Sequence, residues 1–166
     1  MSVLISNDAE LDTLLDAQEV EHICGVVLAA EGVEREVEIS LSYVDEDEMH
    51  ELNLEWRGID RTTDVLSFEC DSAFDEDVPA DETLELGDII LAPQVIARVF
   101  GNSPADECRL MLVHGMLHLL GYDHIEDDEA EVMEAREDAI LRDLALERGE
   151  DPKLVHVGPI TNHAHD

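Results

Sequence analysis

Apolar and polar side chains alternate along parts of this chain in the patterns of strands and helices. Residues 37–44 alternate as a strand with one buried face does, and residues 64–68 and 86–92 are two further strand candidates. Residues 9–30 carry apolar side chains at near-helical spacing, and Asp8 is a suitable N-cap for a helix over that range.

The same helix signals recur further along the chain, where a capping residue or a proline precedes apolar residues. They predict four more helices, over residues 45–56, 93–101, 103–120 and 127–147. Residues 69–85 hold eight acidic side chains and no basic one, which predicts an exposed loop. Strands separated by helices, with some strands adjacent, predict an α+β fold: a small mixed β-sheet packed with about five helices.

Length and composition predict a single domain over residues 1–150, followed by a flexible tail over residues 151–166, which are poor in apolar side chains. No apolar run approaches the roughly 20 residues that span a membrane, and the N-terminus lacks the pattern of a signal peptide. We therefore expect a cytoplasmic protein with no membrane partner. Cys24, Cys70 and Cys108 form no CxxC pair, which indicates reduced thiols that fill the core.

The charge is strongly acidic, with 43 Asp and Glu against nine Lys and Arg, a net charge of -34. Such a surface repels polyanions, so general nucleic-acid affinity is disfavoured and no DNA partner is expected. A local positive cleft would depend mostly on four arginines, which are Arg57, Arg61, Arg98 and Arg109. The excess of carboxylates also suits a salt-rich cytoplasm.

Residues 114–124 read HGMLHLLGYDH and carry the most specific chemistry. His114 and His118 are one helical turn apart on one face, and Gly121 is a good helix terminator. A chain that turns back there can bring His124 to the same point. Three imidazoles with a fourth position open to water form the ligand set of a catalytic zinc site. The alternative is a pair of packed or surface histidines, but unpaired buried imidazoles would be costly.

The histidine spacing matches the register of the metzincin proteases, H-E-x-x-H-x-x-G-x-x-H. In those enzymes the glutamate is the general base, and here Gly115 stands at its position. The spacing therefore predicts a metal site without peptidase chemistry.

Several segments together resemble one known family. The pattern N-x-x-x-R over residues 53–57, then TDVLSF, LGDI and HGMLHLLGYDH, is similar to the YbeY family of bacterial endoribonucleases, and the similarity continues into Met133 and Glu137. One departure is Thr62, where the family usually has proline.

This resemblance implies a zinc-dependent endoribonuclease specific for single strands. It implies one Zn²⁺ on His114, His118 and His124, with Arg57 as the catalytic arginine that contacts phosphate. The expected partners are single-stranded ribosomal RNA and the small ribosomal subunit, whose RNA it would mature at the 3′ end. The nucleophile stays open between a zinc-activated water and the 2′-hydroxyl of the RNA. The alternatives are a non-catalytic assembly factor stabilised by zinc and, less favoured, a zinc peptidase.

Overall fold

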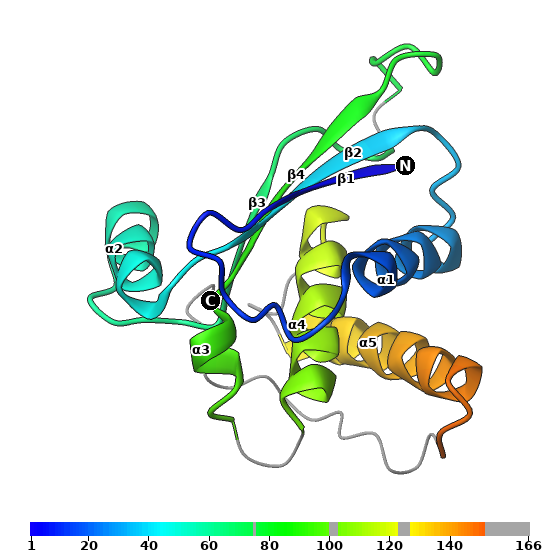
Figure 1. The fold of residues 1–166 in the computed structure, drawn as a ribbon. Helices are drawn as coiled ribbons and strands as arrows, with labels where there is room; N and C mark the ends of the chain where they lie inside the picture. The colour runs from blue at the N-terminus through cyan, green and yellow to red at the C-terminus, as the bar shows by residue number, and fades with distance from the viewer. Residues whose placement is uncertain (75, 100–102, 123–126, 152–166) are drawn as a thin grey trace.

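The structure, a computed structural model, describes residues 1–74, 76–99, 103–122 and 127–151 (Figure 1). Of the predicted tail, residues 152–166 lie outside this part. In chain order the elements are β1 (Ser2–Ser6), α1 (Ala17–Ala30), β2 (Val37–Tyr43), α2 (Glu46–Arg57), β3 (Val65–Glu69), β4 (Leu84–Leu91), α3 (Pro93–Ile96), α4 (Pro104–Leu119) and α5 (Asp127–Glu147). Over the described residues this confirms an α+β fold with a small sheet and five helices.

The four strands form one mixed sheet in the order β1-β2-β4-β3. β1 pairs with β2 and β2 pairs with β4 in parallel, whereas β3 and β4 are antiparallel. The parallel pairs require crossovers, which α1 supplies between β1 and β2. The predicted acidic loop joins β3 to β4, although the strands extend into its ends at Glu69 and Leu84.

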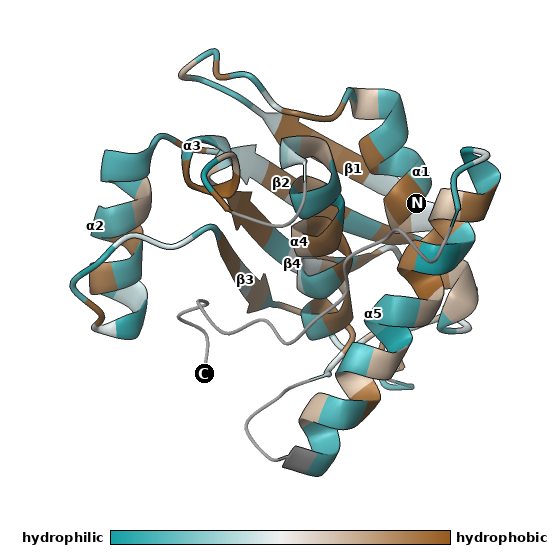
Figure 2. Cartoon of the chain, turned by 90° about the horizontal axis from the view of Figure 1, so that it is seen from below, coloured by the Kyte–Doolittle hydropathy of each residue, from teal (hydrophilic) through white to brown (hydrophobic). Residues whose placement is uncertain are grey.

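One face of the sheet carries the hydrophobic core. Figure 1 shows α1, α4 and α5 together on this side. The alternating pattern of β2 places Val37, Ile39, Leu41 and Tyr43 in the core. α4 packs against β3, β4, α1 and α5, so its side chains are buried continuously from Glu107 to Leu119, apart from the half-buried Arg109. Figure 2 shows α5, by contrast, in alternating hydrophilic and hydrophobic bands, as expected of a surface helix.

The opposite face of the sheet is much less covered. Among the described helices, α2 stands at one end of this face (Figure 1) and contributes Met49 to a small second cluster with Leu66 and Ala92. The remaining outward side chains of β2 and β4, such as Ser42 and Asp88, are half-buried or exposed.

The N-terminal helix begins later than the apolar pattern predicts, at Ala17 instead of residue 9. Asp16 is its N-cap and accepts a hydrogen bond from the Glu19 amide at 2.8 Å. Between β1 and this cap the chain turns, with Glu10 and Leu14 at positive φ, so a continuous helix from residue 9 cannot form. The prediction also missed β1, a short edge strand.

The helix predicted over residues 93–101 is a single turn, α3, which ends at Ile96. The other capping predictions are confirmed: Asp45 caps α2 by accepting from the Glu48 amide, and Ser103 caps α4 by accepting from the Asp106 amide. Of the three thiols predicted to fill the core, Cys24 and Cys108 are buried, but Cys70 is exposed, so that prediction was wrong for Cys70.

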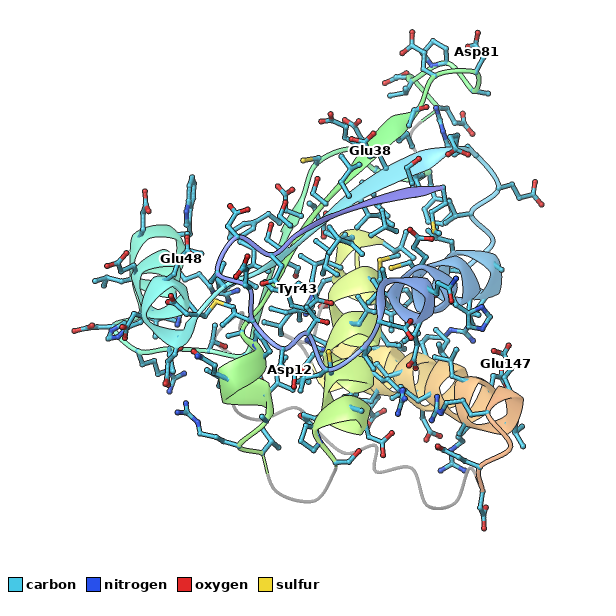
Figure 3. All side chains as sticks on the ribbon, in the orientation of Figure 1. Asp12, Glu38, Tyr43, Glu48, Asp81 and Glu147 are labelled. Carbon is cyan, nitrogen blue, oxygen red and sulfur yellow. The ribbon has the colours of Figure 1, made fainter. Side chains whose placement is uncertain are left out.

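The acidic side chains lie mainly at the surface. Figure 3 shows Glu38, Glu48, Asp81 and Glu147 pointing outward, whereas Tyr43 lies within the core. Two of the four arginines expected in a positive cleft bind carboxylates: Arg98 pairs with Glu46, and Arg109 pairs with Glu19 at 2.7 Å.

No helix in the described residues combines the length and apolar character needed to cross a membrane.

Candidate metal centre

The two histidines of α4 lie deep in the molecule. His114 is 2% exposed and His118 is 9% exposed. The helix carries them into the core because its other side chains are almost all apolar and pack on the sheet and on α1 and α5. Buried imidazoles need hydrogen-bond partners or a metal ion, so the surroundings of their ring nitrogens decide what this site can do.

Both rings are held from behind through Nδ1. The His118 Nδ1 atom lies 2.8 Å from the backbone carbonyl oxygen of Tyr122, which can only accept, so this nitrogen carries a proton and donates. The His114 Nδ1 atom is hydrogen-bonded to a carboxylate oxygen of Glu137 on α5. These are the partners that commonly orient metal-binding histidines: a carbonyl and a carboxylate on the far nitrogen.

The Nε2 atoms of the two rings face each other at a distance of 3.0 Å. The ring planes are nearly perpendicular, at 85°, with centroids 4.5 Å apart. Two imidazole ligands on one tetrahedral zinc ion, each about 2.05 Å from the metal, would place their nitrogens about 3.3 Å apart. The spacing of this pair is therefore within a few tenths of an ångström of that expected for two zinc ligands, although the described residues contain no group of three or more side chains that could hold a metal ion.

Glu137 is itself a buried carboxyl group. The pKa of Glu137 is raised to about 8, mainly because the carboxyl group is buried and to a lesser extent because the Glu134 carboxylate is nearby. A neutral Glu137 carboxyl can donate to the His114 Nδ1 atom, and the proton of that ring then lies on Nε2, where it bonds the His118 Nε2 atom. A metal ion bound there would replace that proton.

The chain reverses directly after these histidines. Gly121 has a φ of 99°, a conformation that favours glycine, and its amide bonds the carbonyl of His118 at 3.0 Å. The Tyr122 amide closes the turn on the carbonyl of Leu117. This confirms Gly121 as the helix terminator. The third predicted ligand, His124, lies outside the described residues, so the structure brings together His114, His118 and Glu137.

Gly115 faces the sheet. A Cβ atom at this position would lie 3.2 to 3.4 Å from the side-chain carbons of Ile89 on β4. The position of the peptidase general base is thus occupied by close helix–sheet packing, and a glutamate there would meet the hydrophobic core.

Arg57 is the last residue of α2, and its side chain is half-buried. Gly58 ends the helix in the left-handed conformation, with a φ of 70°. The following turn is held by Asn53, whose side-chain amide donates to the carbonyl of Arg61 at 2.8 Å. Thr62, the departure from the family pattern, donates to the carbonyl of Glu46 at 3.3 Å and so ties this turn to α2.

Sequence reasoning assigned no role to Glu137 or Asn53. Both residues lie in segments that resemble the family. The partner of Glu137 is distant in the chain, and the partner of Asn53 is a backbone carbonyl. The contact of Glu137 with His114 joins residues 23 positions apart on two helices. Helical spacing predicts the His114–His118 pair, whereas only the packing of α5 on α4 reveals its carboxylate.

Known proteins are similar to this chain over most of its length. The family model for endoribonuclease YbeY matches residues 4–145. A protein from an Exiguobacterium species, named endoribonuclease YbeY, is 37% identical over 90% of this chain and 99% of its own length. The Pelotomaculum thermopropionicum protein of the same name is 40% identical over 89% of this chain and its full length.

Among solved structures, the solution structure of TM1509 from Thermotoga maritima is similar, with a TM-score of 0.59 and 28% identity. The match covers 96% of this chain and 99% of that protein.

Proposed function

The chain belongs to the YbeY family of endoribonucleases, and we propose that it cleaves single-stranded ribosomal RNA with one zinc ion bound by His114, His118 and His124. The observation that supports the metal most directly is the 3.0 Å approach of the two Nε2 atoms, with both Nδ1 atoms engaged behind them. We place this activity in the cytoplasm, on the small ribosomal subunit, where it matures the 3′ end of the RNA. One domain, residues 1–150, carries it.

The protein groups have separate tasks in this proposal. A bound zinc ion would supply a Lewis acid beside the scissile phosphate. Glu137 holds the His114 ring, and the Tyr122 carbonyl holds the His118 ring, so that both Nε2 lone pairs point to one place. Arg57 offers a guanidinium that matches phosphate oxygens and balances the charge that grows on them during cleavage.

The competing functions differ in what they require of this site. A zinc peptidase needs a general base near position 115, and the packing of Gly115 on Ile89 leaves no room for one. A non-catalytic assembly factor would use the ion only to join α4 to α5 through His114 and Glu137.

The experiment is cleavage of a single-stranded RNA that spans the immature 3′ end of the small-subunit RNA. The zinc-loaded protein is compared with His118→Ala and with His22→Ala, a control in which an exposed histidine outside the site is removed. We expect cleavage by the wild type and by His22→Ala but not by His118→Ala. Equal cleavage by all three would indicate a contaminating nuclease. No cleavage, together with normal ribosome maturation by the His118 variant in cells, would favour the assembly factor.

The products then decide the nucleophile. A 2′,3′-cyclic phosphate end indicates attack by the RNA 2′-hydroxyl, whereas a linear phosphate end throughout the time course indicates attack by water.

A further inference from the structure

Trp56 is the only tryptophan of the chain, and 63% of it is exposed. It lies in the last turn of α2, immediately before Arg57. Its ring makes an edge contact with the ring of Phe68 on β3, with centroids 5.9 Å apart and planes at 64°. An indole held from one side and open on the rest is a preformed surface for another flat, apolar group.

The two aromatic rings line a hollow on the outer face of the sheet, with a volume of about 330 Å³. Ser42, Asp88 and Ile90 complete its wall. The volume is near the lower end of the range of small-molecule sites, about 300 to 1,000 Å³. The wall thus combines two rings and one aliphatic side chain with a hydroxyl and a carboxylate.

The sheet separates this hollow from the candidate metal centre, and β4 contacts both. Phe68 is paired with Asp88 across the β3–β4 ladder. Gly87, the residue before Asp88 on β4, lies so near α4 that a Cβ atom there would be 2.7 Å from the side chain of Leu119. Leu119 follows His118 directly. β3 is an edge strand of the sheet, so a path for RNA between the histidines and the outer face would run around it.

The charges decide which part of an RNA chain this hollow would accept. The Asp88 carboxylate repels phosphate, and the whole chain has a net charge of -34. The same carboxylate accepts hydrogen bonds from the exocyclic amino groups of adenine, cytosine and guanine. Stacking on aromatic side chains is the usual means by which proteins hold unpaired bases, and it requires no positive charge.

We propose that this hollow binds one unstacked, amino-bearing nucleobase of single-stranded RNA, stacked on Trp56 and hydrogen-bonded to Asp88. The proposal rests on the proposed function and adds a base-binding surface to it. In this arrangement the phosphates on either side of the base point away from the Asp88 carboxylate.

Trp56 reports on this site directly, because it is the only source of tryptophan fluorescence. The probe is 2′-O-methyl hexaadenylate, which cannot be cleaved through its 2′-oxygen, added in about 1 M KCl, where the Debye length is about 3 Å. We expect saturable quenching of the fluorescence, and weaker quenching by 2′-O-methyl hexauridylate, whose bases lack the amino group. Asp88→Ala should remove this difference between the two probes.

Variants of Trp56 separate stacking from general hydrophobic contact. Their affinity is measured by the anisotropy of fluorescein-labelled 2′-O-methyl hexaadenylate. We expect Trp56→Ala and Trp56→Leu to lose about fivefold to a hundredfold in affinity, and Trp56→Phe to lose much less. The matched control is Leu146→Ala, which removes a side chain of similar exposure, 59%, on α5.

The inference is overturned if labelled hexaadenylate binds while the Trp56 fluorescence stays constant, or if Trp56→Ala binds it as tightly as the wild type. No binding of either probe also overturns it. Failure of this inference can be distinguished from failure of the proposed function. If the protein cleaves RNA but its Trp56 fluorescence does not change with the probe, only the base-binding site is ruled out. If the probe quenches Trp56 fluorescence but the protein does not cleave RNA, only the nuclease activity is ruled out.

Discussion

The Nε2 atoms of His114 and His118 face each other at 3.0 Å, while each ring is fixed from behind through its Nδ1 atom. This relationship prepares two nitrogen ligands for one ion before the ion arrives. It depends on α5 as well as α4, because Glu137 supplies one of the two contacts from behind. Metal affinity should therefore respond to changes on a helix that holds neither histidine.

The first prediction concerns Glu137. Glu137→Ala leaves the His114 Nδ1 atom without its carboxylate, and we expect zinc to bind about ten to a hundred times more weakly. Glu137→Gln keeps an acceptor oxygen and should lose less. The dissociation constant is measured by competition with a chromophoric chelator.

The control is Glu131→Ala, which removes an exposed carboxylate from the same helix and should bind zinc like the wild type. Melting of the zinc-free proteins separates a folding defect from a loss of ligand orientation. Unchanged zinc affinity in a folded Glu137→Ala protein would show that this contact does not orient His114.

Two glycines at the α4–sheet contact should respond differently to alanine. Gly87 has a φ of 151°, and its Cβ atom would lie 2.2 Å from the backbone oxygen of Phe68, so the chain must shift. We expect Gly87→Ala to lower the free energy of unfolding by about 2 kcal/mol or more. Gly115→Ala crowds only the Ile89 side chain at 3.2 Å and gains helix propensity of about 1 kcal/mol, so it should be nearly neutral.

Urea denaturation of the two variants measures both changes. Little or no loss at Gly87 would contradict its close approach to the Phe68 carbonyl, and a loss at Gly115 as large as that at Gly87 would show that the Ile89 side chain cannot give way.

The three thiols should differ in reactivity towards iodoacetamide. Burial raises the pKa of Cys24 and of Cys108 to about 12, so both stay protonated and enclosed at pH 8. Cys70 is exposed, and its pKa is raised by partial burial and by nearby carboxylates. We expect one modified thiol per native chain, at Cys70, with a rate that rises about tenfold per pH unit below its pKa. Mass spectrometry that finds native Cys24 or Cys108 modified as quickly would contradict this arrangement.

Salt should stabilise the protein. The net charge of -34 produces repulsion across the surface that added ions screen, whereas nine basic residues limit the number of attractive pairs that salt weakens. We expect the melting temperature to rise as KCl is raised from about 0.05 M to about 1 M, where the Debye length falls from more than 10 Å to about 3 Å. Choline chloride at equal ionic strength should act similarly. A constant or falling melting temperature would show that repulsion does not govern stability.

Sequence predicted the local elements well wherever one signal was strong. β2 follows from strict alternation, and α4 follows from the Ser103–Pro104 start and the Gly121 stop. The N-terminal error arose where turns interrupt the apolar pattern. The N-cap was predicted at Asp8, but the chain turns with positive φ at Glu10 and Leu14, and the helix begins only after Asp16.

The rest of the site could not be predicted, because it depends on tertiary packing. The spacing of His114 and His118 indicates a shared ligand, but nothing in the sequence indicates which carboxylate among 43 acidic residues lies behind them. The partners of the arginines could not be predicted either, because Arg109 pairs with Glu19, which is 90 residues away in the chain and on another helix.

The most direct test of the zinc-dependent nuclease is to measure RNA cleavage against zinc occupancy in one preparation. The metal-free protein is titrated with zinc, bound metal is counted by mass spectrometry, and the initial rate on single-stranded RNA is recorded at each step. We expect the rate to rise in proportion to occupancy and to level off at about one ion per chain, with no rise in His118→Ala. Cleavage that is already complete without metal, or that is unchanged by the His118 substitution, would contradict a zinc-dependent nuclease built on these histidines.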